Sequence, residues 1–260
     1  MSQEAWSQRE LELSAKLKAL PTLYTLIDDA TQMPFLDDDG AFFLYTTEEL
    51  AREALDYYLQ QLRIWHVVPI KQKDIVPFLG REFYSNGATE AIIDGHPYSR
   101  LKPEILVAKP DYSAVPETQR PVMNPDYIRA LTMLKQEQYW KVDYENKKQV
   151  FTAFEDEMIR TFVKAHFLVP FQSNGNRIAF ASLDGDDGRT AMPVFSDWDQ
   201  FALVYDLNEW NGWVMSADDL LHGPADTVVL NLNTLSFAMS KTFMEKMFKI
   251  YNEELSGTES

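Results

Sequence analysis

Four histidines are the side chains of this chain best suited to proton transfer or metal binding, because the sequence contains no cysteine. They are His66, His96, His166 and His222. Their separation along the chain excludes the paired spacing of a helical zinc site. His66 and His166 fall in apolar strand segments, where a packed histidine with one hydrogen bond is the usual arrangement. We therefore interpret these two as structural.

The loop that carries His96 is the best candidate for a binding site. His96, Tyr98 and Ser99 lie in the segment DGHPYSRL, directly after an expected strand. Open α/β sheets place ligands in loops at the ends of strands. The sequence therefore predicts a contact patch formed by His96, Tyr98 and Ser99, with a purely structural turn as the alternative.

Clustered aspartates at Asp184, Asp186 and Asp187 offer the hard oxygen ligands that Ca²⁺ prefers. An EF-type loop also requires an oxygen ligand at about position five, glycine at six and glutamate at twelve. Counted from Asp184, those places hold Gly188, Arg189 and Phe195. A surface hairpin explains the aspartates better, so the sequence predicts no metal site.

The motifs of common enzyme classes are missing from the sequence. It contains no G-x-S-x-G elbow, no phosphate-binding P-loop and no G-x-G-x-x-G turn. Adjacent carboxylates such as Asp28 with Asp29, or Asp218 with Asp219, diverge on a strand or helix and make poor acid/base pairs. We predict no catalytic residue and no cofactor, and we favour a role that is not enzymatic.

The charge of the chain constrains its partners. Lys and Arg total 24 against 40 Asp and Glu, which gives a formal net charge of -16. Phosphate backbones are bound by Lys and Arg side chains that displace counterions, so direct binding to nucleic acid is not expected. An acidic surface can bind a basic protein or imitate DNA, although solubility alone also explains such a charge.

The N-terminal segment is polar and lacks the basic start and apolar run of a secretory signal. No segment has the roughly 18 consecutive apolar residues of a membrane span. The absence of cysteine suits a reducing compartment. The sequence therefore predicts a cytoplasmic protein with no membrane partner.

The elements that must position the chemical side chains recur in the same order in two halves of the chain. In the first half, a helix over 4–20 precedes a strand over 23–27, and the acidic turn Asp37 to Gly40 predicts a β-hairpin between MPFL and AFFLY. Thr46 is expected to cap the next helix, with Glu49 completing a capping box. RIWHVVPI and ATEAIID predict two further strands.

The second half repeats this order. FVKAHFLVPF and RIAFASL predict strands joined by the turn SNGN, and DGDDG closes the hairpin that follows. Ser196 is expected to cap a helix, with Asp199 three residues later in the place of Glu49. GWVMS, ADDLLHG and DTVVLNL complete the parallel.

These patterns predict an α/β or α+β fold made of two similar mixed-sheet units with flanking helices. The expected boundaries are an N-terminal helix over 1–21, a first copy over 22–101, a proline-containing connection with helices over 102–160, and a second copy with a C-terminal helix over 161–260. Within the connection, EILVA is expected to add a strand to either sheet.

The ordered pattern of FLYTTEEL or PVFSDWDQF followed by a strand leading into IIDGHPYS resembles the SseB family of bacterial proteins. The resemblance covers about Thr22 to Leu101 and, in a more diverged form, about Thr161 to Phe237. It implies two tandem SseB N-terminal-type domains, a bacterial cytoplasmic setting and no established enzymatic activity. NLNTLSFAMS replaces the Gly and Pro of DGHPYSRL in the second copy, so no loop function extends to both.

Three functions remain open at this point. The leading hypothesis is a non-catalytic interaction or regulatory protein with an unknown protein partner. Its candidate interface anchors are Trp65, Trp198, Trp210 and Trp213, although most large aromatic residues lie in cores. The alternative is a small-molecule-binding or hydrolytic protein with its site between the two units. The third is an acidic mimic of nucleic acid.

Overall fold

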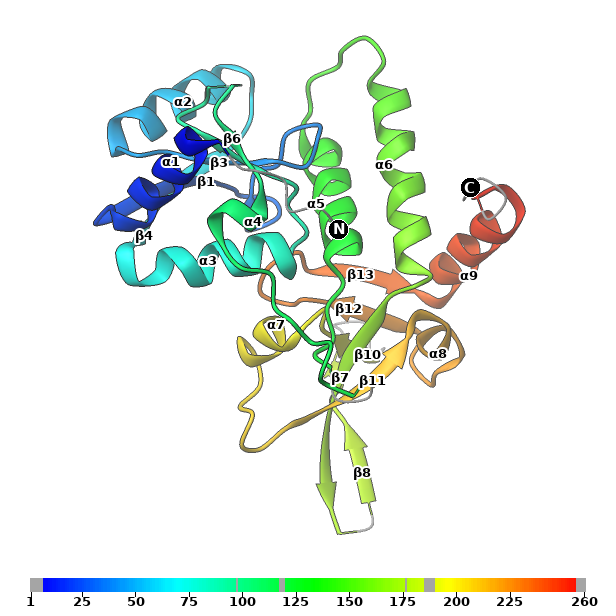
Figure 1. Cartoon of the computed structure of the whole chain (residues 1–260). Coiled ribbons are helices and arrows are strands. Elements are labelled where there is room, and N and C mark those ends of the chain that lie inside the picture. Colours follow the sequence, from blue (N-terminus) through cyan, green and yellow to red (C-terminus); the bar gives the residue numbers. More distant parts are fainter. Residues whose placement is uncertain (1–6, 97, 117–119, 176, 185–189, 256–260) are drawn as a thin grey trace. The chain divides into compact units, whose positions relative to one another are not determined.

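A computed structural model describes residues 7–96, 98–116, 120–175, 177–184 and 190–255 (Figure 1). Helices and four small mixed or antiparallel sheets alternate along these residues, which confirms the predicted α+β class. The chain divides into two compact units. Unit 1 comprises Met1–Ala114 and Lys135–Glu145, and unit 2 comprises Val115–Leu134 and Asn146–Ser260.

Unit 1 contains two three-stranded sheets. Its strands are β1 (Thr22–Asp28), β2 (Met33–Pro34), β3 (Phe42–Leu44), β4 (Trp65–Lys71), β5 (Ala91–Ile93) and β6 (Arg100–Leu101). Its complete helices are α1 (Gln8–Ala19), α2 (Glu48–Gln60), α3 (Gln72–Tyr84) and α4 (Pro103–Leu106). One sheet has the antiparallel order β2-β1-β4, and the other has the order β3-β5-β6 with β3 parallel to β5. A single antiparallel bridge between Tyr24 and Tyr45 joins the two sheets.

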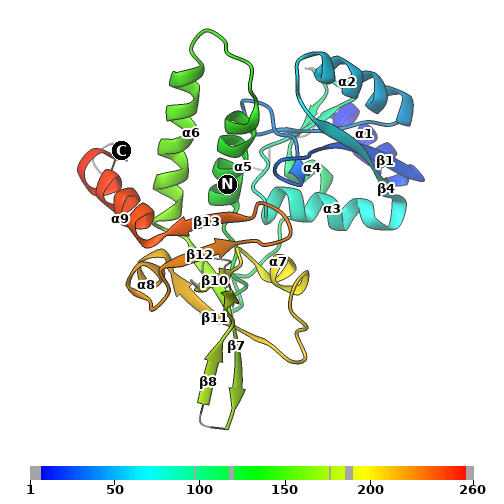
Figure 2. The ribbon, with the colours of Figure 1, turned by 180° about the vertical axis from the view of Figure 1, so that it is seen from behind.

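The core of unit 1 forms because apolar side chains of β1, β3 and β4 face the apolar stripe of α2. Leu26, Phe43 and Trp65 are buried in this cluster, and Tyr58 of α2 packs against it. Figure 2 shows α2 and α3 on opposite sides of the β1–β4 ribbon. Each helix thus packs against the ribbon, while His66 and Pro69 of β4 stay exposed.

Unit 1 is discontinuous in sequence, because α5 (Pro125–Tyr139) is divided between the units after Leu134. The second stretch of unit 1 is bonded firmly to the first. Gln136 accepts a hydrogen bond from the Leu36 N–H and donates one to the Pro34 carbonyl, both at 3.3 Å. The Trp140 indole N–H donates to the Gln61 carbonyl at 2.8 Å. Residues after 134 therefore complete a unit that begins near the N-terminus.

Unit 2 contains a three-stranded sheet, β11-β7-β8, and a four-stranded sheet, β13-β12-β10-β9. Its strands are β7 (His166–Asn174), β8 (Arg177–Phe180), β9 (Leu183–Asp184), β10 (Thr190–Val194), β11 (Asn211–Ser216), β12 (Thr227–Leu230) and β13 (Phe237–Ser240). Its helices after α5 are α6 (Lys147–Phe162), α7 (Trp198–Ala202), α8 (Ala217–His222) and α9 (Lys241–Ile250), followed by a π-helical turn (Tyr251–Leu255). Tyr127, Phe162 and Phe167 are fully buried, and their rings contact one another in tilted and edge-to-face pairs in its core.

The two units share one set of strand pairings. The antiparallel pair β1–β4 has its equivalent in β7–β11, and the parallel pair β3–β5 has its equivalent in β10–β12. The antiparallel partner β6 beside β5 is matched by β13 beside β12. The bridge between Leu168 and Phe195 joins the sheets of unit 2 as the bridge between Tyr24 and Tyr45 does in unit 1.

The hairpin predicted around Asp37 to Gly40 is wrong as a paired ribbon. The strands on its two sides enter different sheets, β2 beside β1 and β3 beside β5, and only a bridge between Leu36 and Phe42 remains. Asp37 closes the turn itself by accepting hydrogen bonds from the Asp39 and Ala41 N–H groups. Pro34 adds no N–H to extend the ladder. Of the equivalent turn DGDDG in the second half, Asp184 ends β9 and the other four residues lie outside the described residues.

Both predicted helix caps are displaced by one residue. Thr47, not Thr46, caps α2 by accepting the Leu50 N–H at 3.3 Å, and Asp197, not Ser196, caps α7 by accepting the Gln200 N–H at 2.9 Å. The residues predicted as caps are engaged elsewhere, as the site geometry below shows. Glu49 and Asp199 therefore complete no capping box.

Two further predictions need correction or adjustment. EILVA does not add a strand, because Pro103 starts the short helix α4 there. The N-terminal helix begins at Gln8, where Ser7 and Glu10 form a reciprocal capping box; its predicted start at Glu4 lies outside the described residues.

Candidate functional site

The loop between β5 and β6, which carries the predicted patch, has a tightly determined backbone. Asp94 and Gly95 adopt left-handed conformations with φ of 53° and 69°. The His96 N–H donates to the Ile93 carbonyl at 3.1 Å, and the Ser99 N–H donates to the His96 carbonyl at 2.8 Å. The Ile93 N–H returns a bond of 2.9 Å to the Ser99 carbonyl. These hydrogen bonds fix the backbone positions from which the exposed side chains of the loop extend.

Asp94 anchors the start of the loop to the end of β3. Its carboxylate accepts the Thr46 N–H at 2.7 Å and the Thr46 hydroxyl at 2.9 and 3.0 Å. Thr46 is therefore used to hold two neighbouring strand ends together, which leaves Thr47 to cap α2. A short side chain that accepts locally also makes the left-handed conformation of Asp94 tolerable.

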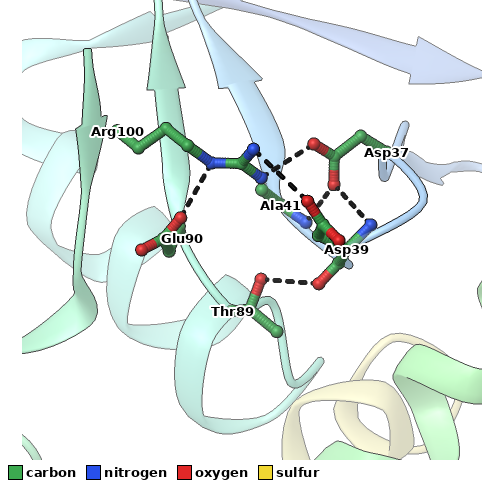
Figure 3. Close-up of polar contacts among 6 residues, drawn as sticks. All are labelled: Asp37, Asp39, Ala41, Thr89, Glu90 and Arg100. Atoms are coloured by element: carbon green, nitrogen blue, oxygen red, sulfur yellow. Dashed lines mark hydrogen bonds and ion pairs between the residues drawn. The ribbon is translucent and has the colours of Figure 1, made fainter. Parts of the chain in front are cut away.

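Arg100 anchors the other end of the loop to the acidic turn (Figure 3). Its Nε donates to Glu90 at 2.8 Å, and its two terminal nitrogens reach Asp37 at 2.8 Å and Asp39 at 3.4 Å. Burial alone lowers the pKa of Arg100, but the carboxylates of Asp37, Glu90 and Asp39 outweigh it and raise that pKa. The turn at Asp37 to Gly40 thus serves as a socket for this guanidinium.

The structure separates the three predicted site residues. Tyr98 and Ser99 line a groove of about 280 Å³ together with Arg9, Glu10 and Leu13 from α1. The Tyr98 side chain is 98% exposed. His96 is exposed but does not line this groove. The loop therefore joins Tyr98 and Ser99 with residues of α1, which sequence spacing alone does not place there.

The remaining histidines lie at the surface. The prediction that His66 and His166 are packed is wrong, because both point to the exposed side of their strands. His66 Nδ1 lies 2.5 Å from a carboxylate oxygen of Asp29. His222 Nδ1 lies 2.9 Å from the Asp218 carbonyl oxygen, at the end of α8. Each of these two rings pairs with an aspartate residue, Asp29 directly after β1 for His66 and Asp218 of the same helix for His222.

A larger groove of about 500 Å³ lies in unit 1, between the turn after β1, the loop before β4 and the end of α5. Asp28 is buried at its wall and accepts the Ala30 and Thr31 N–H groups, at 3.1 and 2.8 Å. Burial raises the pKa of this carboxyl against those two hydrogen bonds. Asp29 points to solvent, so the two adjacent carboxylates diverge as predicted.

Arg63 closes one side of this larger groove. Its guanidinium lies 3.7 Å from the centre of the Trp140 ring and donates to the Gln136 carbonyl at 3.2 Å. Burial lowers the pKa of Arg63, with the charges of Glu137 and Asp28 acting in the opposite direction. The groove thus combines an aromatic wall with a buried acid and a half-buried base.

The four tryptophans proposed as anchors have different environments. Trp65 is 4% exposed and belongs to the core of unit 1, and Trp210 packs against the cluster formed by Leu168, Phe195 and Phe201. Trp198 and Trp213 are exposed. Trp65 is therefore unavailable to a partner and Trp210 is partly buried, so Trp198 and Trp213 are the better surface anchors among these four.

Trp213 is part of an exposed aromatic surface that the sequence interpretation missed. Phe171 of β7 and Phe180 of β8 are direct cross-strand neighbours, and strand alternation places Trp213 of β11 on the same face. Their ring centres lie 5.8 to 6.3 Å apart in all three pairings. Ile178 shares this face. We call Phe171, Ile178, Phe180 and Trp213 the aromatic face.

Comparison with known proteins identifies one part of the chain. Residues 148–245 match the family model described as the SseB protein N-terminal domain. This match runs from α6 into α9 and supports the predicted family for the second copy. It does not cover the first copy, where the closer resemblance was expected, so the tandem arrangement stays a prediction. No curated protein and no solved structure matches the chain significantly.

None of the described helices is both long enough and apolar enough to cross a bilayer.

Proposed function

We propose that this is a non-catalytic bacterial cytoplasmic protein that binds another protein, and that its two units are tandem copies of one SseB-like scaffold. The shared strand pairings and the two equivalent sheet bridges support the duplication. The family match to residues 148–245 supports the family for the second copy.

The observation that carries the binding role is the aromatic face of unit 2. Trp213 is 44% exposed, Phe180 39% and Ile178 51%, yet the three aromatic rings contact one another. Single exposed apolar residues are ordinary on a protein surface, but a contiguous aromatic group is typical of an interface. Aromatic residues also supply most of the anchor side chains of protein interfaces.

The polar side chains near the predicted loop patch support a structural role for that region. Asp94 and Arg100 are occupied by Thr46 and by the three carboxylates of the acidic turn. The loop patch itself, His96, Tyr98 and Ser99, is retained as a second, smaller contact surface of the same protein. We place the principal contact at the aromatic face.

Native co-purification tests the proposed function. The tagged full-length protein is isolated from its source cell at physiological salt, and co-purifying proteins are identified by mass spectrometry. We expect one protein to be recovered in near-stoichiometric amount. Repeated recovery of the chain alone would overturn the binding role.

A small-molecule-binding role is the second candidate, favoured by the larger groove of unit 1. A cavity of about 500 Å³ falls in the size range of ligand pockets, and Asp28 and Trp140 supply polar and aromatic contacts. A thermal-shift screen with a metabolite panel tests it. A ligand that raises the melting temperature of the wild type, but not of Trp140→Ala, would favour this candidate over the first.

A further inference from the structure

The β8 strand is an open edge. In the sheet order β11-β7-β8, only one side of β8 is paired among the described strands, and all four residues Arg177–Phe180 are exposed. An edge strand presents unpaired backbone N–H and C=O groups to any extended segment that approaches it. Peptides that add a strand to such an edge gain main-chain hydrogen bonds, while side-chain contacts provide specificity.

The aromatic face lies directly beside this edge. Ile178 and Phe180 belong to β8 itself, and Phe171 and Trp213 continue the same face across β7 and β11. A strand added to β8 would place every second side chain on this face. The added strand therefore needs apolar residues at alternate positions.

The charge of unit 2 determines which residues are favoured between the apolar positions of the added strand. Between Arg189 and Lys241 the sequence contains no Lys or Arg. It contains Asp197, Asp199, Asp206, Glu209, Asp218, Asp219 and Asp226 over the same stretch, which includes β11 and its two flanks. Glu209 and Asp218 stand two residues before and two residues after β11 and are exposed, whereas the exposed Arg177 begins β8. A basic segment is attracted to this surface and an acidic one is repelled.

We propose that the edge of β8 and the aromatic face form the docking site for an extended, basic segment of another protein, in which apolar residues alternate with Lys or Arg. This inference rests on the proposed binding function and specifies the partner's chemistry. The added strand pairs with β8, its apolar side chains cover Ile178 and Phe180 at the near side of the aromatic face, and the excess of carboxylates in unit 2 attracts its basic side chains.

Selection from a random peptide display library tests this site without knowledge of the natural partner. Full-length wild-type protein is the bait at low and at physiological salt. We expect enriched peptides to alternate apolar residues with Lys or Arg, and their synthetic versions to bind at least about tenfold more weakly to Phe180→Ser/Trp213→Ser. Val76→Ser, which removes a comparably exposed apolar side chain from α3, is the matched control and should bind as the wild type does.

A charge variant keeps the test informative if the serine variant folds poorly. Glu209→Lys leaves the aromatic face intact and should weaken the selected peptides about threefold or more, with a smaller loss at high salt. Peptide binding should also slow amide hydrogen exchange in Arg177–Phe180. Protection of that strand distinguishes strand addition from docking on the aromatic face alone.

Several results would overturn the inference while leaving the proposed function intact. Enrichment of uncharged or acidic peptides, equal binding to Phe180→Ser/Trp213→Ser, or unchanged exchange in β8 would each do so. Dimerisation of the wild type that is lost in the same double variant would assign the site to a second copy of the chain. A partner recovered equally well by that variant in native co-purification would show that binding occurs elsewhere.

Discussion

The two units hold their parallel strand pairs together at equivalent positions, but the hydrogen bond with the hydroxyl group runs in opposite directions. In unit 1 the residue after β5, Asp94, accepts both the N–H and the hydroxyl of Thr46. In unit 2 the residue after β12, Asn231, accepts the Ser196 N–H at 3.0 Å and donates to the Ser196 hydroxyl oxygen at 2.9 Å. Both residues adopt the left-handed conformation, with φ of 53° and 47°.

The difference follows from where each hydroxyl proton goes. Thr46 gives its proton to Asp94, so an acceptor-only carboxylate suffices. Ser196 gives its proton to the carboxylate of the capping residue Asp197 at 2.6 Å, so its oxygen needs a donor. An amide supplies that donor and a carboxylate does not. The choice of helix cap, Thr47 or Asp197, thus determines which side chain can stand on the neighbouring strand.

Asn231→Asp should produce the largest loss of stability. It removes the donor to Ser196 and adds a buried carboxylate near Asp197, at a position that is 1% exposed. We expect the free energy of unfolding to fall by about 3 kcal/mol, measured by urea denaturation. The reverse exchange, Asp94→Asn, should cost about 1 kcal/mol or less, because Thr46 is partly exposed and its oxygen can accept instead. Equal losses of stability in the two variants would contradict the assigned directions of the Thr46 and Ser196 hydroxyl hydrogen bonds.

Asp197→Ala should have the next largest effect. It removes the cap of α7 and the acceptor of the buried Ser196 hydroxyl, so we expect a loss of about 2 kcal/mol. Thr47→Ala removes only an exposed cap of α2 and should cost about 1 kcal/mol. Thermal and urea unfolding of the two variants measure this difference. A larger loss for the Thr47 variant would reverse the ranking of the two caps.

Arg100→Met tests the contribution of the ion pairs between Arg100 and the three carboxylates at the acidic turn of unit 1. It leaves Asp37, Asp39 and Glu90 without their shared cation, and we expect a loss of about 1 kcal/mol that shrinks in high salt. Arg52→Met removes the exposed pair with Glu48 within α2 and should cost no more than about 0.5 kcal/mol. If urea denaturation gave the same loss of unfolding free energy for both variants, the Arg100 ion pairs would add no more stability than an ordinary surface pair.

The smallest effect is a pH dependence at Asp197. Burial, helped by the charge of Asp199, raises the pKa of this carboxyl despite hydrogen bonds from Ser196 and Gln200. Its contribution to stability is therefore fully present below the unfolded pKa of about 3.9 and is lost as the pH rises through the higher folded pKa. Asp197→Asn does not titrate there. The stability of this variant relative to the wild type should increase from pH 4 to pH 7, and a flat or falling difference would exclude the raised pKa.

The order of strands and helices was predictable from alternation, turn residues and apolar stripes, because these signals are local. The helix caps were not. Thr46 and Thr47, like Ser196 and Asp197, are adjacent residues that can both cap a helix. The choice depends on Asp94 and Asn231, which lie 48 and 35 residues further along the chain. No sequence window of one helical turn contains that information.

The candidate surfaces were predictable only in part. The loop with His96, Tyr98 and Ser99 follows a strand as expected, but the contribution of α1 to the groove is set by tertiary packing. Phe171 and Phe180 lie two residues before and four residues after the predicted turn SNGN, so their pairing follows from the observed register and was not predictable from that turn. Their exposure was not predictable either, since an apolar strand more often faces a core.

The division of α5 has a consequence for the order of synthesis. Unit 1 needs Lys135–Glu145, whose Gln136 and Trp140 bond to Pro34, Leu36 and Gln61. A nascent chain therefore cannot finish unit 1 until residue 145 has left the ribosome, and by then the first stretch of unit 2, Val115–Leu134, has already emerged. Neither unit is translated as an uninterrupted block, so the two folding reactions overlap in time.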